Sequence, residues 1–503
     1  MSAVGFVIIA GSAGALGLVW SGATVDTVGK VTFDQPLAIP PLAESTMDAE
    51  GRRVFDLDLR AGTTDFGMGG DAETWGINGS YLGPTLRAER GEDVLVNVTN
   101  GLDETSTLHW HGMHLPAAMD GGPHQMIEPG ATWSPSWQVD QPASTLWYHP
   151  HPHGATADHV YRGLAGMFIL DDPSEAPPGL PSEYGVDDIP LVVQDKVFHD
   201  DGSLSTAEAF LANTGLLGDT ILVNGTVGPV QEVTTTQVRF RLLNGSNARV
   251  YRFTFDDGRE FAHIGSDGGL LPTPVPTTDV QLAPGERAEI VVSFAPGDDV
   301  VLRSEPPDLG AGPLPARFAG GDDRFDVLRL TAAEDLTRSP ELPAELAVVD
   351  DVPAATTQRS FELGEDTING RPMDVERIDA VIEKGTSEVW TVTNVEDVPH
   401  SFHVHDVHFW VLDIDGTAAP PELAGWKDTV YVRPDQTMRL AMSFDDYADP
   451  HLPYMFHCHM LRHEDRGMMG QFTVVDDPAT APTWIDAPDP SSTGEGADHH
   501  AGH

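Results

Sequence analysis

Apolar and polar residues alternate with a period of two along short stretches of this chain. Val94, Val96 and Val98 occupy alternate positions, and a similar rhythm runs through residues 389–393. Clusters of Pro and Gly separate such stretches. Because successive side chains of a strand point to opposite faces, the pattern predicts many short strands and an all-β fold of β-sandwiches. Only two stretches suggest short helices: residues 158–166 and 207–217.

The pattern occurs three times, with a period near 145 residues. Three tripeptides of the form Ile/Val-Asn-Gly are centred on Asn78, Asn224 and Asn369. Each is followed by an apolar run that ends in asparagine, at residues 95–100, 240–244 and 390–394. Three copies of one structural unit therefore account for most of the chain.

We expect each unit to be one domain, because 503 residues are too many for a single core. A run rich in Pro, Ala and acidic residues at 336–358 indicates a linker between the second and third domains. The polar residues 479–503 indicate a disordered tail. The expected domains are residues 45–175, 184–335 and 355–478.

Residues 1–44 precede the first repeat and begin with an uncharged stretch. Residues 3–23 are mostly apolar or small, which suits the apolar part of an export signal or a membrane-anchoring helix. No Lys or Arg precedes Lys30, so the positive start of an export signal is missing, and a buried N-terminal helix is the alternative. We expect an exported protein (periplasmic, cell-surface or extracellular), with a linker leading to residue 45.

Acidic residues dominate the charge of the chain. There are 78 Asp and Glu residues against 28 Lys and Arg residues, and the formal net charge is −50. Such a surface repels nucleic acids and anionic membranes, so neither is expected as a partner. It favours cationic substrates, metal ions included, although solubility or adaptation to salt explains it equally well. We expect the protein to be a monomer. Because the chain has one cysteine, it cannot form an internal disulfide.

The single cysteine lies between two histidines, in the sequence His457-Cys458-His459. His463 and Met468 follow it by five and ten residues. A thiolate, imidazoles and a weak axial thioether are the ligands of an electron-transfer copper. If the stretch is a strand, Cys458 faces one side and its two neighbours face the other. The sequence therefore predicts two metal centres joined by one backbone segment.

Three further His-x-His pairs supply ligands for the second centre, because each pair puts two imidazoles on one strand face. With His457 and His459 they make eight imidazoles, enough for three coppers and too many for a tetrahedral zinc site. His400 is the candidate for the second histidine at the Cys458 copper. The three pairs are His109 and His111, His149 and His151, and His403 and His405.

Four motifs resemble those of the multicopper oxidases, in particular three-domain bacterial laccases and cuprous oxidases. They are HWHG at 109–112, WYHPHPHG at 147–154, HSFHVH at 400–405 and HCHMLRHEDRGMM at 457–469. The similarity covers roughly residues 45–478. It implies three cupredoxin-like Greek-key domains and four copper ions. It also implies one-electron oxidation of phenols, aromatic amines or metal ions, coupled to four-electron reduction of O2 to water.

The resemblance implies a role for each motif residue. The type 1 copper would be bound by His400, Cys458 and His463, with Met468 axial, and the type 2 copper by His109 and His403. Asp120 and Glu464 match acidic residues that the family uses for proton delivery. The second domain carries no ligand and would be a spacer. The type 3 copper pair would be bound by His111, His149, His151, His405, His457 and His459.

Other functions are less well supported by the motifs. An electron carrier or a copper nitrite reductase needs the Cys458 copper but not four His-x-His pairs. A non-enzymatic copper-binding or scaffold protein on the same fold, such as a cell-division protein that has lost its copper, would not need all twelve ligands. The third domain also lacks the Met-rich segment of some cuprous oxidases, so specialised Cu(I) oxidation is not indicated. The remaining histidines near the motifs are expected to be surface or hydrogen-bonded groups: His114, His124, His153, His159, His408 and His451.

Overall fold

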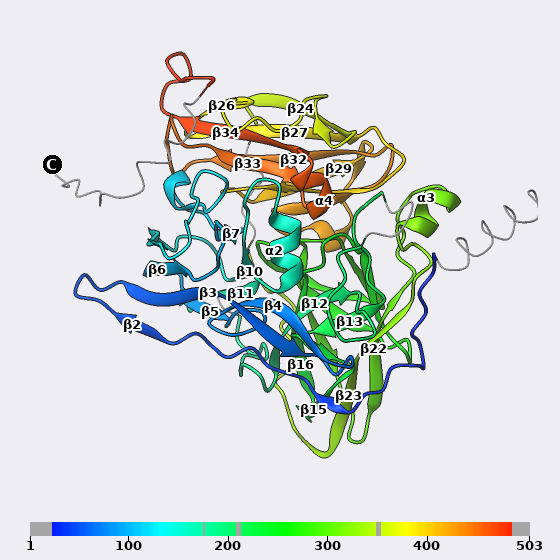
Figure 1. Ribbon diagram of the computed structural model, residues 1–503. Coiled ribbons are helices and arrows are strands. Elements are labelled where there is room, and N and C mark those ends of the chain that lie inside the picture. The colour runs from blue at the N-terminus through cyan, green and yellow to red at the C-terminus, as the bar shows by residue number, and fades with distance from the viewer. Residues whose placement is uncertain (1–22, 175–176, 208–212, 349–353, 485–503) are drawn as a thin grey trace, which may run out of the picture.

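The computed structural model describes residues 23–174, 177–207, 213–348 and 354–484. Six sheets form its framework, and the helices are short. Figure 1 shows the sheets grouped into three β-sandwiches, the first blue to cyan, the second green and the third yellow to red. The expected all-β, cupredoxin-like fold is confirmed. Among the described residues no helix is both long and apolar enough to cross a membrane. The predicted export signal or anchor falls almost entirely on residues 1–22, outside the described ranges.

The first sandwich closes around an apolar core between two sheets. Val94, Val96 and Val98 are fully buried in this core together with Trp110 and Phe168. The predicted alternation therefore does direct one face of the strand inward. One sheet consists of β2 (Ser45–Met47), β3 (Arg53–Asp65), β4 (Asp71–Ile77), β6 (Asp93–Asn100), β8 (Thr132–Trp133) and β9 (Ser136–Gln138). The other contains β5 (Leu86–Glu89), β7 (His109–His111), β10 (Ser144–His149) and β11 (Gly166–Asp171).

The second sandwich also includes the beginning of the described chain. The Val25 amide donates to Asp323, and β1 (Gln35–Pro36) pairs in parallel with β15 (Pro229–Thr235). Part of the predicted N-terminal linker is thus packed against this sandwich. The first sheet adds β17 (Tyr251–Phe255), β20 (Asp279–Leu282), β22 (Asp299–Glu305) and β23 (Phe325–Thr337). The second contains β12 (Asp188–Lys196), β13 (Thr220–Val223), β14 (Thr226–Val227), β16 (Gln237–Asn244), β18 (Phe261–Ser266), β19 (Gly269–Thr277) and β21 (Arg287–Ser293).

The third sandwich carries the Cys458 segment on an inner strand. Strand β33 (Tyr454–Cys458) lies between β28 (His400–Val404) and β34 (Met469–Val475), with β26 (Ala380–Glu383) and β31 (Thr429–Val432) outside them. The facing sheet consists of β24 (Thr357–Gly364), β25 (Thr367–Ile368), β27 (Thr386–Asn394), β29 (Phe409–Ile414), β30 (Thr417–Ala418) and β32 (Thr437–Phe444).

The repeat seen in the sequence corresponds to two asparagine-containing turns, each of which occurs three times. Asn78, Asn224 and Asn369 all have positive φ, a conformation that asparagine tolerates better than most residues. The asparagines that end the apolar runs are fully buried, and each Nδ2 donates to two backbone carbonyls while Oδ1 accepts an amide two residues on. Each turn depends on these bonds, because a buried amide without partners is costly. These residues are Asn100, Asn244 and Asn394.

The first and third sandwiches meet along the segments that follow their histidine motifs. Helix α2 (Thr156–Arg162) packs against α4 (Leu461–Asp465), and Asp465 accepts the two first amides of α2 at 2.9 Å. Figure 1 shows the two helices side by side. The second sandwich joins the first through a smaller apolar cluster that includes Trp147 and Leu243. All three sandwiches are therefore in contact.

The short helices only partly follow the expectation. Helix α2 overlaps the predicted stretch 158–166. Residues 213–217 of the second predicted helix are not helical, and residues 208–212 lie outside the described ranges. Four short helical segments in the described ranges were not predicted: α3 (Pro313–Phe318), α4 (Leu461–Asp465) and the 3-10 turns η1 (Ala117–Met119) and η2 (Pro421–Leu423). Of the predicted disordered tail, Trp484 forms a bridge with Arg377, and residues 485–503 are not described.

Candidate metal centre

Cys458 lies at the end of β33 and contacts two histidines. Its Sγ is 3.6 Å from Nδ1 of His400 and 3.6 Å from Nδ1 of His463. The two nitrogens are 3.2 Å apart. All three side chains are buried, and we call this group the cysteine site. Its one sulfur and two nitrogen atoms converge as the ligands of a single soft metal ion would.

Met468 is tied to the cysteine site by its backbone. Its carbonyl accepts the Cys458 amide at 3.0 Å, and its amide donates to the His463 carbonyl at 2.8 Å. The Met468 side chain is fully buried in the same apolar core as Cys458. The four predicted residues are therefore brought together, although they come from two strands, a short helix and the loop that follows it.

The eight paired histidines form a second buried group at the contact of the first and third sandwiches. Imidazoles from the two sandwiches interleave: His109 stacks on His405 with ring centroids 3.8 Å apart, and His111 stacks on His403 at 3.7 Å. The Nε2 atoms of His151 and His457 are 3.1 Å apart. We call this group the histidine pocket; it contains His109, His111, His149, His151, His403, His405, His457 and His459.

The predicted division of the HCH segment between two sites is present in the structure. His457 pairs with His403 across β28, while Cys458 pairs with Phe402. Consecutive residues of a strand face opposite sides, so Cys458 points to the cysteine site and its neighbours to the histidine pocket. His457 and His459 directly precede and follow Cys458. A single peptide bond on each side of Cys458 therefore connects the cysteine site to the histidine pocket.

Free nitrogen atoms show that the histidine pocket suits metal ions. In each of five imidazoles, one ring nitrogen is buried without a hydrogen-bond partner. In His459, both ring nitrogens are buried without one. Buried polar atoms normally have partners. In this pocket the free atoms lie close together, as metal ligands do, and imidazole is a preferred ligand of copper. Four of the singly free atoms point into the pocket: Nε2 of His109, His149 and His403 and Nδ1 of His111. The fifth, Nδ1 of His151, faces Glu464 instead.

Burial also keeps the imidazoles in the form that binds metal. Burial lowers the pKa of His151 and of His459 to about 3. It lowers the pKa of His111, His149, His403 and His405 well below the ordinary value. These rings are neutral at physiological pH. At the cysteine site, burial raises the pKa of Cys458 to about 12, so a metal ion must displace the thiol proton.

The nitrogens that do not point into the pocket are held by oxygen atoms. His109 Nδ1 is 2.8 Å from the Asp120 carbonyl, and His405 Nδ1 is 2.8 Å from the Asp120 carboxylate. Glu464 lies 3.2 Å from Nδ1 of His457 and 3.6 Å from Nδ1 of His151. Such contacts orient metal-binding imidazoles and select their tautomer. Asp120 and Glu464 are thus brought to the pocket as expected, each buried against two histidines.

Three residues beside the sites were not found from the sequence. Asp428 contacts His111 and His403 in the pocket. Glu396 accepts from Nε2 of His400 at 3.0 Å, and the Asn213 carbonyl accepts from Nε2 of His463 at 2.9 Å. Only Glu396 had a local signal, because it precedes His400 by four residues. The other two approach from distant parts of the chain.

Two histidines outside the predicted ligand set differ from the expectation. The rings of His114 and His408 are 4.5 Å apart, and both Nε2 atoms are buried without a hydrogen-bond partner. The sequence predicts that both histidines are surface or hydrogen-bonded groups. By contrast, His159 contacts Ser106 and His124 contacts Gln471, as expected for hydrogen-bonded groups.

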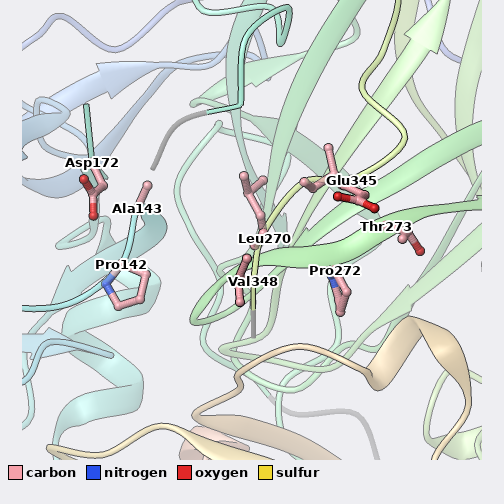
Figure 2. A pocket seen from close by; sticks show the side chains of 10 residues that line it. Pro142, Ala143, Asp172, Leu270, Pro272, Thr273, Glu345 and Val348 are labelled. Atoms are coloured by element: carbon pink, nitrogen blue, oxygen red, sulfur yellow. The ribbon is translucent and has the colours of Figure 1, made fainter. Parts of the chain in front are cut away.

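A separate cavity of about 520 Å³ lies between the first two sandwiches and residues 345–348. Figure 2 shows Pro142 and Asp172 on one side and Leu270 and Pro272 on the other. None of the residues that line it is a predicted ligand. The cavity therefore does not belong to the candidate metal centre.

Comparisons with known proteins agree with this geometry. Two models described as multicopper oxidase match residues 59–175 and 338–478. A protein named multicopper oxidase mco from Staphylococcus haemolyticus is 35% identical over 448 residues, with 88% of this chain and 92% of that protein covered. The chain belongs to the multicopper oxidase family. Membership implies copper as the cofactor, and the free nitrogens of the pocket suit that metal.

Relatives within the multicopper oxidase family have different names. The cell division protein FtsP of Escherichia coli is 38% identical over 452 residues, with 88% of this chain and 93% of that protein covered. The solved laccase of Pediococcus acidilactici is 35% identical with a TM-score of 0.80, covering 89% and 95% of the two chains. A laccase-like CueO from an Ochrobactrum species is 36% identical with a TM-score of 0.79, covering 88% and 100%. The family is thus certain, while the names of relatives do not fix one activity.

The lowered histidine pKa values predict acid sensitivity of the copper-free protein. In the unfolded chain these imidazoles take up protons below about pH 6.5, whereas the folded protein does not until near pH 3. The unfolded state binds more protons in this window, so stability falls as the pH falls. Each imidazole contributes a slope of up to about 1.4 kcal/mol per pH unit.

Thermal unfolding of the copper-free protein, followed from about pH 7 to pH 5, tests this expectation. The surface carboxylates titrate mostly below that range, so they contribute little there. A Tm that stays constant over the range would contradict the burial of neutral imidazoles.

Proposed function

We propose that this protein is a copper-dependent oxidase. It couples the one-electron oxidation of phenols, aromatic amines or metal ions to the four-electron reduction of O2 to water. The observation that carries the proposal is the position of Cys458. The end of one strand places the Cys458 thiol in the cysteine site. It places the neighbouring His457 and His459 in the eight-histidine pocket. An oxidase of this kind needs a site that accepts single electrons and a site that collects four.

The proposed copper ligands follow the two groups. His400, Cys458, His463 and Met468 would hold the type 1 ion. His109 and His403, each with a free Nε2 atom, would hold the type 2 ion. Four ions in all would be bound. The type 3 pair takes the other six histidines of the pocket: His111, His149, His151, His405, His457 and His459.

Within this scheme the bound coppers supply the electron transfer and the reaction with O2. The protein contributes a short covalent path, since Cys458 is bonded directly to His457 and His459. Burial of every pocket imidazole excludes bulk water from the site. Asp120 and Glu464 lie against pocket histidines and are the proposed donors of the protons consumed when water forms.

Oxygen uptake by the copper-loaded protein tests the proposal. We expect uptake with a phenol, an aromatic diamine and Fe(II), with water rather than hydrogen peroxide as the product. Because the net charge is −50, cationic donors should have the lower KM at low salt, and added salt should reduce the difference. Uptake with Cu(I) alone would narrow the substrate class to metal ions, and no uptake with any donor would contradict the proposal.

The similarity to FtsP favours one alternative, a scaffold on the same fold that performs no oxidation. The complete set of buried, converging ligands opposes it, since such free nitrogens are costly unless they bind metal. Copper content after loading separates the two: a scaffold that has lost its copper would bind none.

Export is the remaining part of the proposal. It is supported by the uncharged stretch at residues 3–23. Fractionation of the producing cell, with the N-terminus of the exported form sequenced, tests it; recovery only from the cytosol would contradict it.

A further inference from the structure

We propose that Arg287, in the second sandwich, is a positioning residue for the histidine pocket and acts through Asp428. The inference rests on the proposed copper site and extends it. The second domain has no predicted copper ligand, and its sequence suggested only a spacer. In the structure, one charged side chain of the second domain contacts Asp428, and Asp428 contacts two pocket histidines.

The guanidinium of Arg287 connects all three sandwiches. Its Nη1 and Nη2 donate to the two carboxylate oxygens of Asp428 at 2.7 and 2.5 Å. Its Nε donates to the Thr145 carbonyl at 2.9 Å, on the strand that ends at His149. Arg287 and Asp428 are both fully inaccessible to solvent. The two-pronged contact fixes the orientation of the carboxylate as well as its place.

Asp428 in turn holds one histidine from each copper-binding sandwich. His111 Nε2 is 3.0 Å from the Asp428 carboxylate, and His403 Nδ1 is 2.8 Å from the Asp428 carbonyl. Both oxygens can only accept, so those two nitrogens carry the protons. The lone pairs are then on Nδ1 of His111 and Nε2 of His403, the same two atoms that lack a partner in the pocket. Asp428 therefore selects the tautomer that each ring needs to bind metal.

The turn before Arg287 contacts the pocket independently. Gly285 has φ +86°, and a Cβ there would lie 2.9 Å from the ring of His459. The Pro284 carbonyl accepts a hydrogen bond from the Ser401 hydroxyl at 2.8 Å. Ser401 lies between His400 and His403 in the sequence. The second sandwich thus supports the pocket with both backbone and side chain.

The charge arrangement suits positioning better than stability. Burying an ion pair generally costs as much solvation as its attraction returns, and apolar replacements are often equally stable. Here the two-pronged contact with Arg287 holds both carboxylate oxygens of Asp428, which leaves the carboxylate in one orientation toward His111.

The test uses Arg287→Gln, Asp428→Asn and the double variant, each loaded with copper. We expect the type 1 absorption to be unchanged, because neither residue contacts the cysteine site. Copper affinity of the histidine pocket, measured by chelator competition, should fall about ten- to a hundredfold, with an altered type 2 EPR spectrum. If Arg287 acts through Asp428, the double variant should be no worse than Asp428→Asn alone.

Arg249→Gln is the matched control. Arg249 is also a buried arginine of the second sandwich, held by Asp195 and Asp323, so its loss tests the effect of any broken buried ion pair. The control should leave the type 2 spectrum unchanged. An equal change in the control, additive losses in the double variant, or a wild-type spectrum in Arg287→Gln would overturn the inference.

Imidazole nitrogen NMR of the copper-free proteins separates this inference from the proposed function. The expected wild-type tautomers are Nε2-protonated His111 and Nδ1-protonated His403, and Arg287→Gln should change the His111 signal. If the wild type bound no copper, the proposed function would fail while this result still decided the role of Arg287. If Arg287→Gln did not fold, Asp428→Asn and Arg287→Lys would provide the same readouts.

Discussion

Replacing Cys458 with serine abolishes the oxidation of every donor, to the level of the copper-free protein. Cys458 is the only sulfur anion available to the cysteine site and the covalent connection to His457 and His459. A serine hydroxyl is a hard, weakly acidic group and does not replace a thiolate as a copper ligand. The variant should lose the intense thiolate-to-copper absorption and the donor-driven uptake of O2.

The Cys458→Ser variant should keep the ions of the histidine pocket, because no pocket histidine is altered. Copper content should therefore fall from four ions to three. Met455→Leu is a useful control, since Met455 is buried on the same strand and is not a predicted ligand. Retention of the absorption band in Cys458→Ser would show that the thiol is not a ligand.

Replacing Glu464 with glutamine slows turnover by about a hundredfold or more, within the range typical of lost general acid–base catalysis. Glutamine keeps the size of the side chain beside His457 and His151 but has no carboxyl proton to give. The loss should affect the reaction with O2 and spare the acceptance of electrons. Anaerobic bleaching of the type 1 band by a donor should keep the wild-type rate, while reoxidation by O2 becomes slow.

Asp465→Asn serves as the comparison for Glu464→Gln. Asp465 is the next residue and a partly buried carboxyl, but it accepts backbone amides of α2. The Asp465→Asn substitution should therefore lower the stability of the protein more than its turnover rate. If Glu464→Gln bleached slowly and reoxidised normally, Glu464 would serve the cysteine site instead.

Local patterns in the sequence predicted the strands and most of the site. Alternation placed Val94, Val96 and Val98 in the first core, because the period of two is a property of each strand alone. The same property correctly separated Cys458 from its neighbours. The repeated Ile/Val-Asn-Gly tripeptides revealed the three units, because a repeat is visible in the sequence without knowledge of any contact.

Contacts between distant segments could not be predicted in this way. Arg287 precedes Asp428 by 141 residues, and His111 precedes it by 317. Nothing in either local sequence specifies which buried charge meets which ring, because that depends on how the three sandwiches dock. For the same reason the sequence of the second domain, which carries no predicted ligand, predicts only a spacer. The packing of Val25 and β1 onto the second sandwich was likewise not evident from an extended, Pro-rich segment.

Anomalous diffraction at the copper edge, from crystals of the copper-loaded protein, tests the central claim most directly. The account predicts four peaks: one bounded by His400, Cys458 and His463, and three among the eight histidines contributed by the first and third sandwiches. A single peak beside Cys458, or none in the histidine pocket, would contradict it.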